Sequence, residues 1–394
     1  MTITQPVFAT MLLLALIALG EVISIITRAR VPMLLVTLIG FLVLIWTGIF
    51  PKNIVETSSF NQIGMLLVTP LVVHLGTLIP LKQMLQQYKA VLIALTGTLF
   101  AVVLVLPVIT FIFGYETAVS GVGPLVGGIV AFIITSTELK EAGFSYLVVI
   151  PALVLSLHKL FGMPAATFFL RKYALILRDQ MDQNRETAAS LEAVLPDEKP
   201  VVLEKSPVKK YQFNTANILL FKLFVGGALA IVLEQVTGLH NTVWCLIIGV
   251  LGRSIKIYDE SMMDKAKASS VAMLGAIFIV IASMSEVKFS QFIHFIPQIL
   301  LIIVIGLIGI LLGSYLCSKL LKWHPYQGMS LALTAMFGFP ADYILCQEVS
   351  RSIGRTEEEQ QLLLEKLSPP MLIGGFTTVT IASVVIASFL VKTL

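Results

Sequence analysis

An interrupted apolar segment near the C-terminus carries residues suited to ion chemistry. The run at about 329–345 contains LTAMFGFPADY, in which Gly338 permits a tight turn and Pro340, lacking an N–H, ends a helix. Carbonyl groups freed near Phe337 and Gly338, together with the carboxylate of Asp342, would suit a cation. The segment therefore predicts a Na⁺ site near Gly338 and Asp342, and no other metal site is expected.

A second interrupted segment lies at about 124–137, within VGGIVAFIITSTEL. Two adjacent glycines at its start allow close packing against neighbouring helices. Its polar end supplies three hydroxyls and a carboxylate as candidate ligands for solute or ion: Thr135, Ser136, Thr137 and Glu138. The alternative is that Glu138 and Asp342 lie at the membrane interface and only cap helix ends.

Two basic side chains inside apolar runs are further candidates. Lys159 lies in the middle of the run 144–170, and a charge inside the membrane is expensive enough to suggest a function. Lys159 would pair with a substrate carboxylate or take the place of a coupling cation; the alternative is a structural ion pair with Glu21 or Asp342. His74 lies in another run and either lines the transport path or packs as a hydrogen-bonded residue.

The composition shows which elements must position these side chains. Of the 394 residues, 57% are hydrophobic and only 13% are charged, and the mean hydropathy is +0.93. Soluble domains carry about 25% charged residues, so the chain is predicted to be an all-α polytopic membrane protein. Its three cysteines have no metal-like or disulfide-like spacing.

Long apolar runs predict ten membrane spans, because one span needs about 20 apolar residues. The two interrupted segments are too short to cross and are predicted to be re-entrant hairpins. The ten runs are 7–27, 31–50, 61–80, 90–114, 144–170, 213–236, 241–258, 268–287, 296–320 and 371–391.

The placement of the 27 Lys and Arg residues supports this topology. With both termini outside, the central linker in the cytoplasm and both hairpins re-entrant, nearly all basic residues outside the spans fall on the cytoplasmic side. The exceptions are Lys52, Lys140, Lys288 and Lys392. A full crossing by either short segment would weaken this bias.

The chain divides into two halves around one long polar stretch. We expect an N-terminal membrane repeat at 1–178, a cytoplasmic linker at 179–212 and a C-terminal repeat at 213–394. Shifting the second half back by 206 residues superposes the two interrupted segments and sets Asp342 on Ser136. Each half then has five spans, an odd number, so the repeats are predicted to be inverted, as in many secondary transporters.

This plan resembles the bacterial glutamate:sodium symporters and the related 2-hydroxycarboxylate transporters. The resemblance covers almost the whole chain in topology, and in motif it rests on Gly127, Gly128 and Gly338 of the two interrupted segments. It implies a secondary carrier, a homodimer with a scaffold and a moving, elevator-type transport domain. It also implies that the hairpin residues lie near substrate and ion.

The function predicted is ion-coupled secondary transport, driven by Na⁺ or H⁺, of a small organic anion such as an amino acid or carboxylate. The alternatives are a channel or a non-transporting membrane sensor. Enzymatic activity is not expected, since Asp342 is the only aspartate within an apolar run and no HExxH or phosphate-loop motif occurs. We expect no cofactor beyond the coupling ion, no nucleic-acid partner, and a place in the cell membrane.

Overall fold

The computed structural model describes residues 5–78, 87–192, 215–238, 241–282, 284–285 and 289–394. Within these ranges every regular element is helical, so the prediction of an all-α polytopic membrane protein is confirmed. Of the predicted linker, 179–192 continues the preceding helix and 193–212 lies outside the described residues, as does Lys288.

The helices before the linker include one pair that is separated by a short break. They are α1 (Pro6–Ile26), α2 (Met33–Trp46), α3 (Ile54–Ser58), α4 (Phe60–Leu78), α6 (Tyr88–Phe113), α7 (Tyr115–Leu125), α8 (Ile129–Glu141), the 3₁₀ turn η1 (Ser145–Val148) and α9 (Val149–Glu192).

The helices after the linker come in a similar order, with an interrupted segment again preceding the last long helix. They are α10 (Ala216–Thr237), α11 (Asn241–Ser254), α12 (Met262–Lys265), α13 (Ser269–Ala282), α14 (Phe289–Leu320), α15 (Pro325–Ala332), the 3₁₀ turn η2 (Leu333–Met336), α16 (Ala341–Ile353), α17 (Glu357–Phe376), the π-helical η3 (Thr377–Ala382) and α18 (Ser383–Val391).

Seven stretches of the described residues are long and apolar enough to cross a membrane, not ten. The predicted runs 31–50, 241–258 and 268–287 instead form α2, α11 and α13, each of 14 residues. At 1.5 Å per residue such a helix is about 21 Å long, shorter than the ~30 Å hydrocarbon core. The apolar runs overestimated α2 and α11 because residues beyond their ends, such as Ile49 and Ile257, are also apolar.

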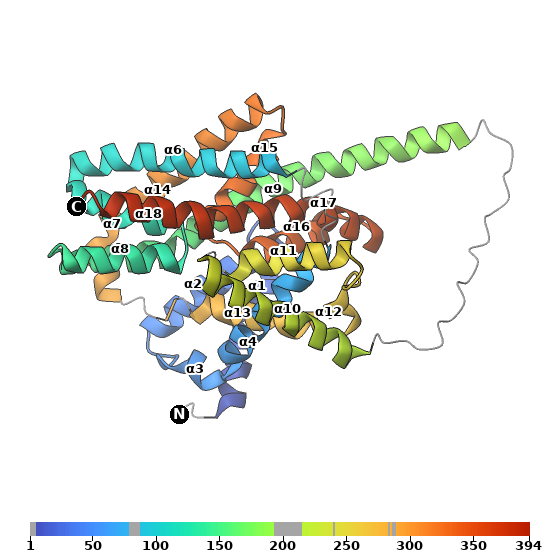
Figure 1. Ribbon diagram of the computed structural model, residues 1–394, viewed down its shortest axis with the longest axis horizontal. Helices are drawn as coiled ribbons and strands as arrows, with labels where there is room; N and C mark the ends of the chain where they lie inside the picture. Colours follow the sequence, from blue (N-terminus) through green and yellow to red (C-terminus); the bar gives the residue numbers. More distant parts are fainter. Residues whose placement is uncertain (1–4, 79–86, 193–214, 239–240, 283, 286–288) are drawn as a thin grey trace.

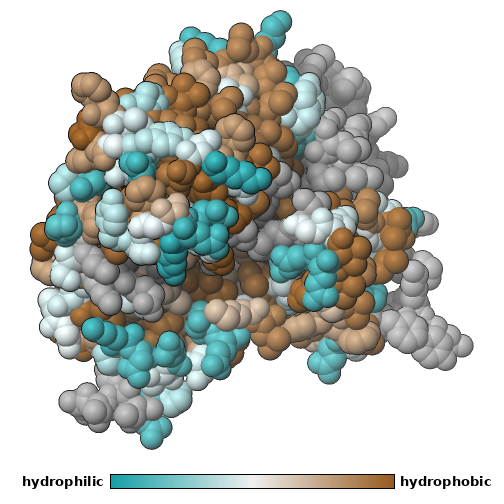
Figure 2. All heavy atoms as spheres, turned by 60° about the vertical axis from the view of Figure 1, so that its left-hand side comes forward, coloured by the Kyte–Doolittle hydropathy of each residue, from teal (hydrophilic) through white to brown (hydrophobic). Residues whose placement is uncertain are grey.

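Large apolar side chains are exposed on the spans, as lipid contact requires. Phe111, Val236, Val7 and Ile26 are all more than 70% exposed. On the face seen in Figure 2, apolar side chains cover broad areas between clusters of polar residues. No water-facing domain would leave so much apolar surface uncovered.

The helices form two groups in the view of Figure 1, and the buried apolar side chains form two clusters. Figure 1 shows α6, α9 and α17–α18 along the longest axis, with α1, α4, α10 and α13 grouped below them. The long helices α6 and α14 pack along each other, while α4 packs against both α11 and α13. Residues of α13, α16 and α17 contribute to both clusters.

Close helix crossings fix the position of α4. A Cβ on Gly64 would lie 2.2 Å from the carbonyl oxygen of Gly275 in α13, and a Cβ on Gly249 of α11 would lie 2.2 Å from the carbonyl oxygen of Val73. Only glycine permits such backbone contact between membrane helices. These crossings hold the C-terminal part of α4, including His74, between α11 and α13.

Candidate functional site: two helix breaks and a polar pocket

Both interrupted segments are broken helices. The first break separates α7 from α8 at Val126–Gly128, and the second separates η2 from α16 at Phe337–Pro340. Gly338 has φ +60°, a left-handed conformation that glycine adopts without strain, as its role in a tight turn requires. The first pair lies toward the left of Figure 1 and the second toward the right.

The two breaks meet at one side chain of η3. A Cβ on Gly128 would lie 2.8 Å from Val379 Cγ1, and a Cβ on Gly338 would lie 3.0 Å from Val379 Cγ2. Gly127 packs still closer to this helix, since its Cβ would lie 2.0 Å from Ser383 Cβ. The segment that receives both breaks is itself π-helical, a deviation often found at functional sites.

Helix α9 contacts both breaks from another direction. His158 is buried and contacts the backbone of Pro124 and Leu125, at the end of α7. One turn later, Gly162 lies against the second break, where a Cβ would be 3.2 Å from the Phe337 ring. Residues at i and i+4 share a helix face. The two breaks are therefore enclosed by one face of α9 and by η3.

Most of the predicted hairpin residues are buried, but not all. Phe337, Pro340 and Asp342 are buried in the second segment, and Thr135 and Ser136 in the first. Thr137 and Glu138 are exposed on α8 and face away from the interior. The helical period explains the difference, because consecutive residues point about 100° apart.

Asp342 lies behind the second break. Its Oδ1 accepts a hydrogen bond of 2.7 Å from the Tyr343 backbone N–H, while its Oδ2 has no hydrogen-bond partner among the described residues. A Cβ on Gly375 of α17 would lie 2.5 Å from this Oδ2. The carboxylate is thus enclosed between α16 and α17.

Lys159 is half-buried on α9, directly after His158. Glu21, one of the two carboxylates predicted as its structural partner, instead pairs with Arg351 at 2.7 Å. Lys159 directly follows the face of α9 that contacts the two breaks, and its role as a solute ligand or as a structural partner of Glu21 or Asp342 stays a prediction.

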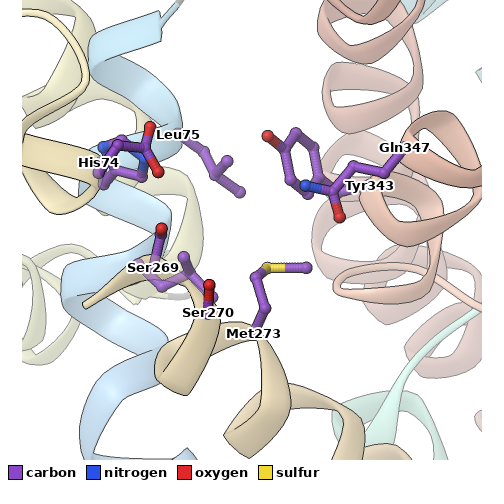
Figure 3. A pocket seen from close by; sticks show the side chains of 9 residues that line it. His74, Leu75, Ser269, Ser270, Met273, Tyr343 and Gln347 are labelled. Atoms are coloured by element: carbon purple, nitrogen blue, oxygen red, sulfur yellow. The ribbon is translucent and has the colours of Figure 1, made fainter. Parts of the chain in front are cut away.

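A polar pocket of about 180 Å³ adjoins the second break. Figure 3 shows Tyr343 and Gln347 of α16 facing His74 and Leu75 of α4 and three residues of α13 across it. Its lining consists of Leu71, His74, Leu75, Asp264, Ser269, Ser270, Met273, Tyr343 and Gln347. The pocket therefore joins the α4 group to the second broken helix.

His74 and Asp264 form the charged wall of this pocket. The imidazole Nδ1 accepts a 3.4 Å hydrogen bond from the Met263 backbone N–H, and Nε2 lies 3.4 Å from Asp264 Oδ2. The neutral ring satisfies both partners when Nε2 carries the proton. The hydrogen bond from His74, the largest influence, and one from Ser269 lower the pKa of Asp264, while burial acts in the opposite direction.

Of the predicted site residues, only His74 lines the pocket. Sequence reasoning missed Asp264, which lies in the short helix α12, and Ser269 and Ser270, which begin α13 within the predicted run 268–287. It also missed Tyr343 and Gln347. Their i, i+4 spacing directly after the broken segment is a signal that sequence analysis can use.

Comparison with known proteins gives no identification. No protein-family model matches the chain, and no curated protein matches it in sequence. The functional argument therefore rests on the geometry of the breaks and the pocket.

Proposed function

We propose that this membrane protein is a secondary transporter coupled to Na⁺ or H⁺. The observation that carries the proposal is that two broken helices meet at Val379 of η3, with α9 contacting both breaks. Broken helices within a membrane bundle are tolerated where their free backbone groups are buried in protein or line a cavity, and paired breaks mark the substrate sites of transporters.

The packing pattern supports two inverted repeats. The broken pair α7–α8 packs against α18 of the other half, and α15 and α16 pack against α9. Likewise α6 packs with its positional counterpart α14, and α4 with α13. Such reciprocal contacts are what a pseudo-two-fold axis relating the halves would produce, and they fit an elevator-type carrier that assembles as a homodimer.

Two positions would serve the solute and the coupling ion. Lys159, beside the breaks, is the residue that would attract a small organic anion such as an amino acid or carboxylate. The carbonyls near Gly338 and the enclosed Asp342 are the groups that would hold Na⁺. With proton coupling, Asp342 would instead carry the proton.

Exchange in proteoliposomes tests the proposal. Vesicles containing the purified protein are loaded with one solute from a panel of carboxylates, amino acids, amines and sugars, and counterflow of the labelled solute is measured in Na⁺ and in K⁺. We expect exchange for one chemical class and at least a ten-fold loss for Lys159→Ala if that class is anionic. Folded protein that exchanges no member of the panel would contradict the proposal.

A further inference from the structure

The polar pocket has a charge that does not suit an anion. None of its nine lining residues, all within the described part of the chain, is a lysine or an arginine. Asp264 is the one carboxylate among them, and its side chain is 52% exposed. A carboxylate solute placed here would meet a like charge at short range, which disfavours binding.

Asp264 is arranged to remain ionised. The hydrogen bonds from His74 and Ser269 stabilise its charged form, so that its pKa is lowered from the ordinary value. His74 holds one carboxylate oxygen through Nε2, and its Nδ1 accepts a hydrogen bond from the Met263 N–H. Asp264 therefore gives this wall of the pocket a carboxylate that a bound cation can pair with.

The remaining walls suit an organic ion better than a metal ion. An aromatic ring, a thioether and two leucines, from Tyr343, Met273, Leu71 and Leu75, stand beside the hydroxyls of α13. Na⁺ would gain nothing from the apolar groups, whereas an alkylammonium group binds favourably over an aromatic face. The volume of about 180 Å³ far exceeds the roughly 15 Å³ that one water needs.

We propose that this pocket binds a small organic cation, an amine or quaternary ammonium compound, with Asp264 as its counter-charge. Tyr343 would contact the cationic group, and Ser269, Ser270 and Gln347 would accept or donate hydrogen bonds to its polar substituents. Such a cation would be a second class of solute for the proposed transporter. Binding to the pocket does not depend on transport; only the statement that the bound cation is carried rests on the proposed function.

Binding is measured in detergent, separately from transport. The probes are choline and ethanolamine, with dimethylbutanol as the neutral carbon isostere of choline, lactate as an anion, and NaCl alone. Isothermal titration and thermal unfolding of the full chain provide two independent readouts. We expect choline or ethanolamine to bind and to raise the unfolding midpoint, and the neutral isostere and lactate to do neither.

Variants locate the site. Asp264→Asn is expected to weaken binding at least ten-fold, while Asp259→Asn, which makes the same charge change outside the pocket lining, leaves it unchanged. Should Asp264→Asn fail to fold, Ser270→Lys adds a positive charge from an exposed position and is expected to abolish binding.

The outcomes are distinguishable. Equal affinity for choline and its neutral isostere, stabilisation by NaCl alone, or amine binding that persists in Ser270→Lys would overturn the cation assignment, even if the protein transports another solute. Amine binding without flux into proteoliposomes would support the cation site and count against transport through it.

Discussion

The two breaks differ in how they are held in place. The first depends on glycine packing: Gly127 and Gly128 press against Ser383 and Val379 of the last helix. The second is followed by α16, which is buried along almost its whole length and is joined by polar contacts to α1 and α2. One break is held by close packing, and the other by hydrogen bonds.

Matching residues of the two helices that follow the breaks show the same contrast. Both α8 and α16 have 13 residues, and their eighth residues are Ser136 and Glu348, each buried. The Ser136 hydroxyl has no hydrogen-bond partner among the described residues. Glu348 instead accepts from Ser24 Oγ at 3.0 Å and from the first N–H of α2, at Met33, at 3.1 Å.

This difference suggests which break is free to move in the conformation seen here. A carboxylate at a helix N-terminus satisfies an orphan N–H and interacts favourably with the helix dipole. Glu348 thereby ties α16 to α2, and the Arg351–Glu21 pair adds a second tie to α1. Motion of α16 relative to α1 and α2 must break both contacts, whereas α8 has no comparable contact among the described residues.

The largest effect is expected at the first break. Gly127→Ala would place a Cβ 2.0 Å from Ser383 Cβ, and such overpacking costs about 1–3 kcal/mol or more. We expect a clearly lower unfolding midpoint in detergent and loss of solute exchange. Adding Ser383→Gly removes the opposing Cβ and should restore much of both; failure of this rescue would show that the contact does not hold the break.

Gly338→Ala is expected to have a smaller effect on stability than Gly127→Ala. The left-handed conformation costs a residue with a Cβ about 1–2 kcal/mol, but the nearest atom, Val379 Cγ2 at 3.0 Å, belongs to a side chain that can shift. Thermal unfolding of both variants measures the order. The reverse order would mean that the second break, too, is held mainly by packing.

Glu348→Ala tests the hydrogen-bonded anchor. Losing these bonds leaves the Met33 N–H and the Ser24 hydroxyl without their acceptor, at a cost of about 1–3 kcal/mol. Ser136→Ala, at the matching position of α8, is the control and should change stability by less than about 1 kcal/mol. Equal shifts in the unfolding midpoint for the two variants would contradict the contrast between the breaks.

Asp342→Asn should separate ion binding from folding. The carboxamide keeps the size and the acceptor for the Tyr343 N–H, so the unfolding midpoint in K⁺ is expected to change little. The apparent affinity for Na⁺ is measured from the rise in unfolding midpoint as Na⁺ replaces K⁺. If Na⁺ binds near Gly338, this affinity should fall at least ten-fold in the variant. A variant that retains the full Na⁺ response would exclude Asp342 as an ion ligand.

The smallest effect concerns the pocket beside the second break and its dependence on pH. Because the folded-state pKa of Asp264 is lowered, its ionised form contributes stability above the unfolded-state pKa of about 3.9, and this contribution is lost as the pH falls through the folded-state value. The difference in unfolding midpoint between wild type and Asp264→Asn should therefore shrink as the pH falls below about 4. A difference that does not shrink there would contradict the lowered pKa of Asp264.

Sequence analysis located the breaks but not their surroundings. Gly127, Gly338 and Pro340 interrupt an apolar run and act on the local backbone. Their effect on the helix can therefore be predicted without knowledge of the tertiary structure. The 206-residue shift sets Gly338 on Phe132, whereas the first break lies at Val126–Gly128, so the shift superposes the two segments but not the two breaks.

The contacts between distant segments lay beyond sequence reasoning. His74 and Asp264 are separated by 190 residues, and nothing in either local pattern indicates that they meet. Glu348 lies just beyond the predicted segment 329–345 and was not predicted as a contact, yet it is 5% exposed and bonded to α1 and α2. Such pairings depend on how helices cross, which composition and periodicity leave undetermined.

The most direct test of the central claim is uphill accumulation. Proteoliposomes containing the wild-type protein receive the solute identified by counterflow at equal concentration on both sides, and a Na⁺ or H⁺ gradient is then imposed. The account predicts several-fold accumulation that collapses when an ionophore dissipates the gradient and that is absent from Gly127→Ala. Simple equilibration unaffected by either gradient, in liposomes whose protein is folded, would contradict coupled transport and favour a channel.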